Sequence, residues 1–488
     1  MTARNGPAIL IIGAGFGGIG MAIELRRHGF HDITILERAA DLGGVWRENT
    51  YPGAACDVPS PLYSYSFEPK PDWPQRYSGR AAIHGYLRGV AERHGVLDAI
   101  QFDTTVTDAE FDDATGHWTV RTADEDTRTA DVLISAVGQL SRPAMPAIPG
   151  LDSFSGPSFH SAEWDHDVEL TGKRVACVGT GASAVQYIPE IQPKVAHLTL
   201  FQRTPAWVIP KFDTDYSPIQ HNLFARVPGA LLVERFGWWS IAEFFSLGLV
   251  ELPAITRFMA RIAAWHLARQ VEDPDLRDKL TPDYPIGCKR VLFSNDYYPA
   301  LTQPNVRVET TPITEIIPEG LRTADGAVHE VDVIIYGTGF KGTEFLWPMT
   351  IRGRAGRTLS EAWAEGAHAY YGIAVPDFPN LFLVYGPNTN LGVGSIIYML
   401  ESQARYIRQA VQLLTDHPGH CLDVRADLEQ DYNTVLQRRL ARTPWNFCAS
   451  WYRDAAGRIT NNWPGSQTSY RRRTRHLDPA HYTLTPVS

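Results

Sequence analysis

The 488-residue sequence predicts an α/β protein with two Rossmann-like dinucleotide-binding domains and a helical insertion in the second of them. Two glycine-rich turns each lie between an apolar strand pattern and a helical pattern, as in a dinucleotide-binding βαβ unit. A charged residue ends the strand that follows each turn. Residues 215–280 interrupt the second unit with a mostly helical pattern. The composition, 44% hydrophobic and 20% charged, is ordinary for a globular protein with packed cores.

The first unit begins with "AILIIGAGFGG". Residues 8–12 predict a buried parallel strand, and Gly13, Gly15 and Gly18 then form G-x-G-x-x-G. The first glycine permits the bend, the second lets the backbone approach a pyrophosphate, and the third keeps helix and strand close. The next strand ends at Glu37, whose carboxylate can accept hydrogen bonds from a ribose diol but would repel a 2′-phosphate. The first unit is therefore predicted to bind FAD or NAD.

The second unit begins with "KRVACVGTGASA". Residues 175–178 predict its strand, and Gly179, Gly181 and Ala184 form G-x-G-x-x-A. The following strand ends at Arg203, a residue that suits the 2′-phosphate of NADP. An arginine at this position also fits a surface ion pair, and that alternative stays open.

Two further strands and two Pro/Gly-rich stretches divide the chain. Apolar strands are expected at 132–137 and within 331–340, the latter followed by a glycine turn. Proline and glycine cluster near 143–150 and 342–348, which makes these stretches the best candidate domain boundaries.

Charge and cysteine usage narrow the class of protein. The net charge of -9 argues against nucleic acid as a partner, because phosphate binding favours a basic surface, and the arginines at 471–473 are expected to be a solvated run. The five cysteines are far apart and form no CxxC motif. This pattern argues against disulfides, metal sites and a dithiol redox centre, and fits a reducing cytoplasm. The N-terminus leads directly into a strand, which leaves no room for a secretory signal.

The most apolar segment is residues 236–250, "FGWWSIAEFFSLGLV". It is too short to span a bilayer and contains Glu243, so no integral membrane segment is expected. A core or interdomain helix is the favoured interpretation, and a peripheral membrane contact is the alternative.

Two dinucleotide sites in one chain indicate hydride transfer from NADPH to a flavin. The electrons then need an acceptor. No CxxC motif is present to receive them as a disulfide, and no cluster of metal ligands stands out. Oxygen is the remaining simple acceptor.

Three motifs carry a resemblance to a known family. "FSGPSFHSAEWD", with Phe154, Gly156, His160 and Trp164, fits F-x-G-x-x-x-H-x-x-x-W-[P/D]. This fingerprint resembles that of the type I (class B) flavin-dependent Baeyer–Villiger monooxygenases. The related N- and S-oxygenating flavin monooxygenases have tyrosine or phenylalanine in place of the tryptophan. "GGVWRENTYPGAACD" and "YPIGCKR" are similar to two further family segments, and all three occur in the family's order.

The resemblance implies an architecture and a reaction. Residues 1–150 and 349–488 would form the FAD-binding domain, and 151–348 the NADP-binding domain with its helical insertion at about 215–280. The implied enzyme is an NADPH- and FAD-dependent monooxygenase that inserts one oxygen atom of O2 beside a ketone carbonyl through a C4a-peroxyflavin, giving an ester or lactone. A small-molecule ketone and O2 are its expected partners. An N/S-oxygenating monooxygenase is the alternative, and a flavoprotein scaffold without turnover is less favoured.

The resemblance also implies residue roles. Arg290 matches the catalytic arginine, whose fixed cation favours an anionic peroxide and the negative adduct it forms with the ketone. Asp57 matches the acidic partner that holds this arginine. Lys289 matches the lysine that joins Arg203 at the 2′-phosphate. His160 and Trp164 are expected to fasten the domains to each other rather than to act in the chemistry.

The full set of expected cofactor-binding residues includes backbone, aromatic and charged groups. Trp46 is expected to wall the flavin and exclude water. Gln139, Asn388 and Ser395 are candidates for bordering the flavin or substrate, and a helix at 391–406 is expected to direct its N-terminus at the flavin. The expected cofactor-binding set is Gly13, Gly15, Gly18, Glu37, Arg38, Trp46, Asp57, Val106, Gly179, Gly181, Ser183, Arg203, Thr204, Lys289 and Gly339.

Overall fold

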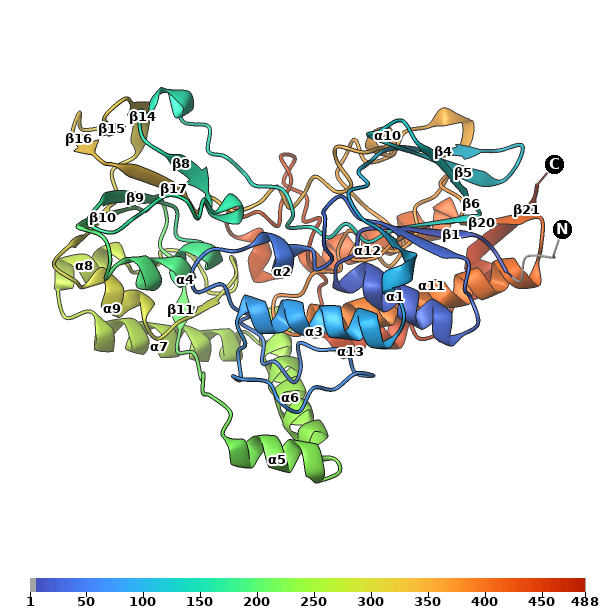
Figure 1. The fold of residues 1–488 in the computed structure, drawn as a ribbon, viewed down its shortest axis with the longest axis horizontal. Helices are drawn as coiled ribbons and strands as arrows, with labels where there is room; N and C mark the ends of the chain where they lie inside the picture. The colour runs from blue at the N-terminus through green and yellow to red at the C-terminus, as the bar shows by residue number, and fades with distance from the viewer. Residues whose placement is uncertain (1–5, 488) are drawn as a thin grey trace.

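The structure is a computed structural model that describes residues 6–487. Residues 1–5, on which part of the prediction about the N-terminus depends, lie outside the described residues. Two five-stranded parallel sheets occupy opposite halves of the molecule, and both ends of the described chain lie in the same half (Figure 1). This arrangement confirms the predicted fold class of two Rossmann-like units.

The first sheet combines strands from both ends of the chain. Every neighbouring pair in it is parallel. Helix α1 (Phe16–Arg27) packs against α11 (Ile396–Asp416) over this sheet, so the C-terminal part completes the first core. The strand order is β19 (Leu381–Leu383), β7 (Val132–Ser135), β1 (Ile9–Ile12), β2 (Ile33–Leu36) and β3 (Ile100–Gln101).

The second sheet comes from the middle of the chain and repeats the same plan. Its strands are also all parallel. Helix α4 (Ala182–Ile191) follows β9 and packs on the sheet through Ala184, Val185 and Ile188. The strand order is β13 (Val306–Glu309), β10 (His197–Phe201), β9 (Arg174–Val178), β17 (Val333–Tyr336) and β8 (Ser158–His160).

The remaining strands form small sheets beside these two. Strand β18 pairs with β4, which returns the chain to the first half after residue 349. The strands outside the two five-stranded sheets are β4 (Val106–Asp112), β5 (His117–Thr122), β6 (Thr127–Ala130), β11 (Val208–Ile209), β12 (Leu292–Phe293), β14 (Ile313–Ile317), β15 (Gly320–Thr323), β16 (Val328–Glu330), β18 (Thr350–Arg352), β20 (His420–Val424) and β21 (Tyr482–Pro486).

Among the helices outside the insertion, α11 (Ile396–Asp416) differs in its bounds from the helix that the sequence predicted. The helix expected at 391–406 instead begins at Ile396 and continues to Asp416, because buried residues recur at helical spacing along this whole length. The other helices of the two halves are α2 (Val45–Glu48), α3 (Arg80–Arg93), α9 (Tyr297–Leu301), α10 (Leu359–Ala362), α12 (Ala426–Leu440) and α13 (Gln467–Arg473).

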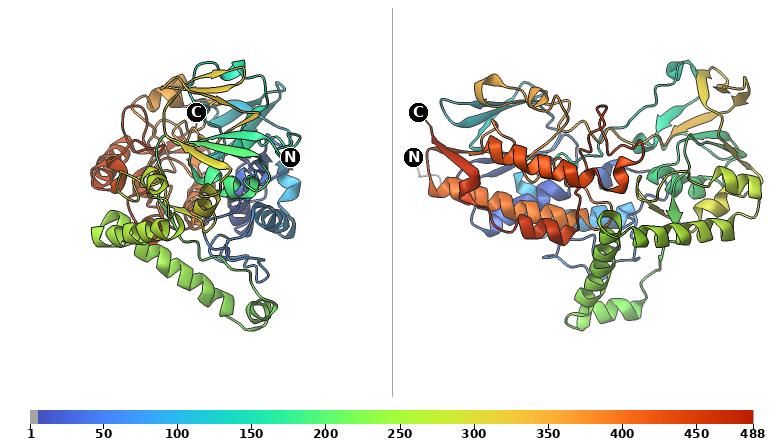
Figure 2. Two further views of the ribbon diagram at one scale, coloured as in Figure 1. Left: turned by 90° about the vertical axis from the view of Figure 1, so that its left-hand side faces the viewer. Right: turned by 180° about the vertical axis from the view of Figure 1, so that it is seen from behind.

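Helices alone fill residues 218–279, where a helical insertion was expected. They are α5 (Pro218–Arg226), α6 (Ala230–Val250), α7 (Pro253–Gln270) and α8 (Pro274–Lys279). Helices α5 and α6 project from the body of the molecule, as Figure 1 and both views of Figure 2 show. Within residues 6–487, no single helix is long and apolar enough to cross a membrane, although α6 and α7, bent by 108° at their junction, pass that test as a pair.

Two expectations about surface and core are wrong in part. Residues 236–250 form no core helix, since only Ala242, Ser246, Gly248 and Leu249 of this segment are buried. The three arginines at 471–473 are not uniformly solvated either. Arg471 donates to the buried carboxylate of Glu401 over 3.1 Å, because the fold brings α11 and α13 together.

Candidate active site

The first glycine turn has the geometry that a pyrophosphate site requires. Gly13 has a φ of 102°, and a Cβ there would lie 2.8 Å from the Ala136 oxygen. A Cβ on Gly18 would lie 1.9 Å from the Gly13 oxygen, so only glycine allows this helix to approach its strand. Gly15 caps the N-terminus of α1 and faces Gly44. The result is a backbone cradle at a helix N-terminus, which fits the phosphates of a dinucleotide.

The charged end of β2 lies beside this cradle. Glu37 is buried, and its carboxylate accepts the Ala14 N–H over 2.8 Å and the Ala39 N–H over 3.0 Å. Each carboxylate oxygen retains a second lone pair for a ribose hydroxyl. The next residue, Arg38, is exposed and forms an ion pair with Glu48 of α2. Val106 begins β4 and is buried in the adjoining core.

The second glycine turn repeats the first. Gly179 has a φ of 108°, and a Cβ there would lie 2.4 Å from the Gly337 oxygen. Gly181 caps the N-terminus of α4. Ser183, in the first turn of α4, is half-buried, and the Tyr51 hydroxyl of the first half donates to Gln186 Oε1 of the same helix over 2.9 Å. Gly339, with a φ of 87°, has open space around the position of its missing Cβ. In both cradles, therefore, a glycine with positive φ follows the strand and a second glycine caps the next helix.

Two cations lie near the second cradle. Arg203 is exposed, and within residues 6–487 no ion pair engages it, so the structure does not favour the surface ion-pair alternative. Lys289 places its Nζ 4.7 Å from the centre of the Tyr284 ring. Burial lowers the pKa of Lys289, and the nearby charge of Arg203 lowers it further. Thr204 follows Arg203, and its carbonyl accepts the Thr180 hydroxyl over 2.7 Å.

Arg290 and Asp57 meet in a two-pronged ion pair although 233 positions separate them in the sequence. The Arg290 Nε donates to Oδ2 of Asp57 over 3.0 Å, and Nη2 donates to Oδ1 over 2.6 Å. The attraction of Asp57 raises the pKa of Arg290 above its ordinary value. The arginine side chain remains 38% exposed and that of the aspartate 17%. This pair is thus a permanent cation with part of its surface still open to a ligand.

The chain holds both members of the pair from two sides. Asp57 lies two residues after Ala55, whose carbonyl accepts the Gln186 amide of α4 over 2.9 Å. Arg290 lies just before β12, which pairs with β11. Gly287 precedes it with a φ of 87°, and a Cβ there would collide with the Leu249 side chain of α6. Segments from the two halves therefore position the ion pair jointly.

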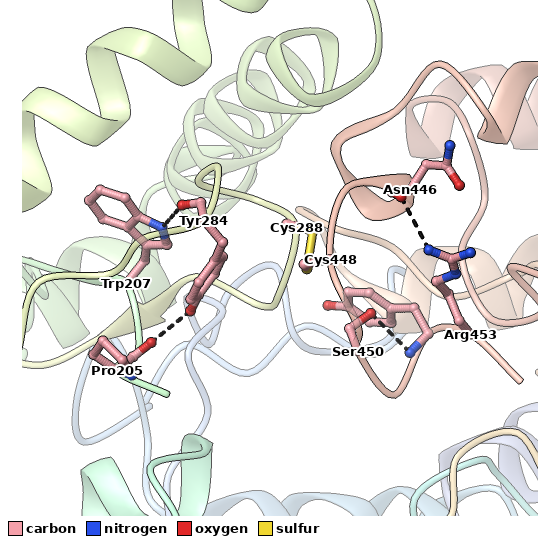
Figure 3. The surroundings of a disulfide bond; sticks show 9 residues. Pro205, Trp207, Tyr284, Cys288, Asn446, Cys448, Ser450 and Arg453 are labelled. Atoms are coloured by element: carbon pink, nitrogen blue, oxygen red, sulfur yellow. Dashed lines mark hydrogen bonds between the residues drawn. A yellow bond between two sulfur atoms is a disulfide. The ribbon is translucent and has the colours of Figure 1, made fainter. Parts of the chain in front are cut away.

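A disulfide joins Cys288 to Cys448, which corrects the prediction from the cysteine pattern. The fold brings residues 160 positions apart to a Cα–Cα distance of 6.1 Å, within the range that a disulfide spans. Figure 3 shows the bond linking the segment of Tyr284 to the loop that carries Ser450 and Arg453. The other three cysteines are buried thiols. Cysteine spacing thus no longer supports a reducing compartment.

Thiol counting tests the disulfide. We expect the air-equilibrated protein, unfolded without reductant, to show three reactive thiols toward a disulfide reagent, and five after reduction, since two of the five cysteines are joined. Cys448→Ser should lower the free energy of unfolding by about 2–4 kcal/mol. This difference from the wild type should disappear in excess dithiothreitol. Five thiols before reduction would contradict the bond.

The fingerprint segment forms the edge of the second sheet, and aromatic contacts link its Trp164 through α4 to the first half. His160 ends β8, and burial lowers the pKa of its imidazole, which favours the neutral ring. Trp164 packs on Tyr187 of α4, with the ring centres 5.5 Å apart, and Tyr187 packs in turn on Tyr51 of the first half. A Cβ on Gly156 would lie 2.6 Å from the Asp332 oxygen. Phe154 packs beneath the same sheet.

Aromatic and amide side chains line the first half near its contact with the second. The Trp46 Nε1 donates to the Tyr63 hydroxyl over 3.0 Å. Gln139 donates to the Tyr385 carbonyl over 2.9 Å, and Asn388 to the Ile459 carbonyl over 2.9 Å. The N–H groups of these amides tie their loops together, whereas the buried Asn388 Oδ1 has no hydrogen-bond partner among the described residues. Ser395 precedes α11, but its hydroxyl donates to the Leu62 carbonyl.

The charge of Arg290 affects the pKa values of two tyrosines, Tyr452 and Tyr385, that the sequence did not indicate as part of the site. Burial raises the pKa of Tyr452 to about 12, and the Arg290 cation opposes this rise. Tyr385 is partly buried, burial also raises its pKa, and its hydroxyl donates to Asn390 Oδ1 over 2.8 Å. Both tyrosines come from the C-terminal part, where no motif marked them. Only the fold places them beside the central ion pair.

A family model and two curated relatives agree on the kind of protein that this chain resembles. The family model for flavin-binding monooxygenase-like proteins matches residues 7–237. A Baeyer–Villiger monooxygenase of Streptomyces coelicolor is 46% identical over 98% of this chain and 92% of its own length. A second, of Pseudomonas aeruginosa, is 42% identical with the same coverage.

Solved structures of similar proteins share the whole fold. OTEMO in complex with FAD and NADP has a TM-score of 0.89 at 28% identity, covering 98% of this chain and 99% of that one. An oxidized steroid monooxygenase bound to NADP has a TM-score of 0.86 at 30% identity, with the same coverage.

Proposed function

This chain belongs to the Baeyer–Villiger monooxygenases, and from that premise we propose that it is a type I enzyme in which Arg290 is the catalytic cation and Asp57 its positioning partner. The enzyme uses FAD, NADPH and O2 to insert one oxygen atom beside a ketone carbonyl, giving an ester or lactone. The observation that carries the residue assignment is the two-pronged Arg290–Asp57 pair, built from segments of both halves and still partly open.

The residues present fit both cofactors. The cradle of Gly13, Gly15 and Gly18, with Glu37 beside it, suits FAD, and the cradle of Gly179 and Gly181, with its two cations, suits NADPH. Bound FAD, once reduced by NADPH, supplies the activation of O2. We propose that the FAD-binding domain comprises 1–150 and 349–488, and the NADP-binding domain 151–348. The pairing of β18 with β4 and of β19 with β7 supports this division.

Arg290 can stabilise negative charge at two stages without exchanging a proton. Its guanidinium stays protonated throughout, and Asp57 strengthens this by raising its pKa. It therefore favours the deprotonated form of the oxygen being transferred and then the negative oxygen on the former ketone carbon. Asp57 occupies one edge of the guanidinium, which orients the remaining N–H groups. Trp46, half-buried, is proposed to limit water near the flavin.

The cation pair Arg203 and Lys289 is proposed to select NADPH over NADH. We expect replacement of both by alanine to lower kcat/KM for NADPH about 10²–10⁴-fold, since each charge-assisted contact contributes roughly 1.5–3 kcal/mol, while NADH is little affected. Arg307→Ala, an exposed arginine on β13, is the control. Comparable losses with NADPH and NADH would contradict the proposal.

The same clamp should depend on pH. Lys289 has a lowered pKa, so it loses its charge at lower pH than an ordinary lysine, whose pKa is about 10.4. The preference for NADPH over NADH is therefore expected to fall as the pH rises through the lowered value. Bound 2′-phosphate stabilises the charged form, so the decline should appear in KM rather than in kcat. Lys289→Arg should remove it, which steady-state kinetics across an alkaline series would reveal.

Product identification tests the reaction. The purified holoenzyme is incubated with NADPH, O2 and a panel of linear, cyclic, aromatic and steroid ketones plus a thioether, and the products are identified by mass. We expect an ester or lactone from at least one ketone. Sulfoxide without any ester or lactone would favour the N/S-oxygenating alternative. NADPH consumption unchanged by every ketone would favour a flavoprotein scaffold without turnover.

A further inference from the structure

Helix α6 turns its polar side chains toward the protein. Arg235 donates to the Pro61 carbonyl over 2.6 Å. The Glu243 carboxylate accepts the Thr468 N–H over 3.1 Å, and the Ser246 hydroxyl donates to the Val393 carbonyl over 3.0 Å. The inward face of this projecting helix is therefore attached by hydrogen bonds and ion pairing rather than by a continuous apolar stripe.

The outward face of α6 is apolar. Every exposed residue between Ala230 and Val250 lacks a polar side chain. Six of them have large side chains that are 40% to 72% exposed: Leu232, Val233, Phe236, Ile241, Phe244 and Leu247. From Val233 onward they follow one another at intervals of three to five positions, close to the helical repeat. We call these six residues the α6 face. A water-facing helix normally shows the opposite pattern, with its apolar stripe against the core.

Helix α5, which contacts α6, adds further apolar surface. Ile219 is 80% exposed, Leu223 45% and Val227 48%. With roughly 100 Å² left accessible on each of these large side chains, the α6 face and these three residues offer on the order of 900 Å². An exposed apolar patch on a typical monomer reaches only about 300–600 Å². One partner in a standard protein interface contributes about 800 Å².

We propose that a second copy of this chain covers the α6 face in a two-fold symmetric dimer. A two-fold interface brings one patch against itself, and an uncharged helical stripe meets this condition without opposing like charges. A lipid surface is the rival occupant and fits α6 itself less well. An interfacial helix needs lysine or arginine on its polar side, whereas the only basic residue of α6, Arg235, is bonded inward, the exposed Arg257 and Arg261 lie on α7, and the chain carries a net charge of -9.

The oligomeric state of the FAD-bound enzyme tests this proposal. Light scattering after size-exclusion chromatography should give about twice the chain mass of 54.4 kDa. The double variant Phe236→Glu, Phe244→Glu should elute as a monomer with FAD still bound, because its dimer would bring four carboxylates into an apolar interface. The matched control Val435→Glu changes an equally exposed apolar residue on α12 and should remain dimeric.

Two further measurements keep the outcome decisive. If the double variant fails to fold, Phe236→Cys in oxidising conditions should form a disulfide-linked dimer on non-reducing gels that Val435→Cys does not form. Wild-type enzyme that is monomeric at tens of micromolar, or a dimer that persists in the folded double variant, would overturn the proposal. So would a monomer that co-sediments with vesicles of phosphatidylcholine and phosphatidylglycerol, which would assign the α6 face to lipid. None of these outcomes depends on the reaction that the enzyme catalyses.

Discussion

Arg290→Ala is expected to slow ester formation by about 10²–10³-fold while leaving flavin reduction by NADPH intact. The variant removes the cation that stabilises negative charge on the transferred oxygen and on the carbonyl adduct. Losing one such preorganised group costs about 10²–10³-fold in kcat. The two glycine cradles and the Arg203–Lys289 cation pair do not involve this side chain, so both cofactors should still bind. Stopped-flow reduction of the flavin and product analysis measure the two halves separately.

The conservative variant sharpens this test. Arg290→Lys retains a positive charge but cannot engage Asp57 through two N–H groups, so we expect it to recover only part of the lost rate. NADPH consumption in the alanine variant should end in hydrogen peroxide rather than ester. Ester formation at the wild-type rate in Arg290→Ala would contradict the assignment of the catalytic cation.

Asp57→Ala is expected to have the second largest effect, on both rate and stability. Without its partner, the half-buried Arg290 loses a charge-assisted two-pronged contact, which we expect to lower the free energy of unfolding by about 1–3 kcal/mol. Because Asp57 no longer holds the Arg290 guanidinium in position, kcat should also fall about 10–100-fold, as it does after small displacements of a catalytic group. Denaturant unfolding and steady-state kinetics measure the two effects.

Two controls separate position from general damage. Asp427→Ala breaks an exposed aspartate–arginine pair, with Arg425, and should leave both stability and kcat nearly unchanged. In the background of Arg290→Ala, the further change Asp57→Ala should have little additional effect on rate, since it acts through the arginine. Independent, additive losses would show that Asp57 does not act through Arg290.

Local motifs predicted the two nucleotide units well. The steric demands of Gly13, Gly18 and Gly179 are short-range, because each Cβ would collide with backbone that the same turn brings close. Strand periodicity likewise depends on neighbouring residues, and β1, β2, β7, β9, β10 and β17 lie where strands were expected, whereas no pattern indicated β3, β8 or β13. The start of α11 was placed five residues too early, although Gly392, Gly394 and the N-cap residue Ser395 are local signals for a helix that begins at Ile396.

Long-range contacts followed from no motif read by itself. Arg290 and Asp57 were matched only by resemblance, and their hydrogen bonds depend on how the two halves meet. Tyr452 and Tyr385 were not expected near this pair at all. The cysteine prediction failed for the same reason, since spacing along the chain says nothing about the approach of Cys288 to Cys448.

The two-dinucleotide plan, the order of its parts and the family of oxygenation chemistry could all be predicted from the sequence, because glycine turns, strand patterns and motif spacing are local constraints. The folded chain was needed to show which distant side chains share a site, which cysteines are bonded and which face of α6 meets solvent. An apolar helix is compatible with a core, a membrane or a partner, and the direction of its polar side chains excludes the core. In this chain they point inward, because Arg235, Glu243 and Ser246 find their partners in the body of the molecule.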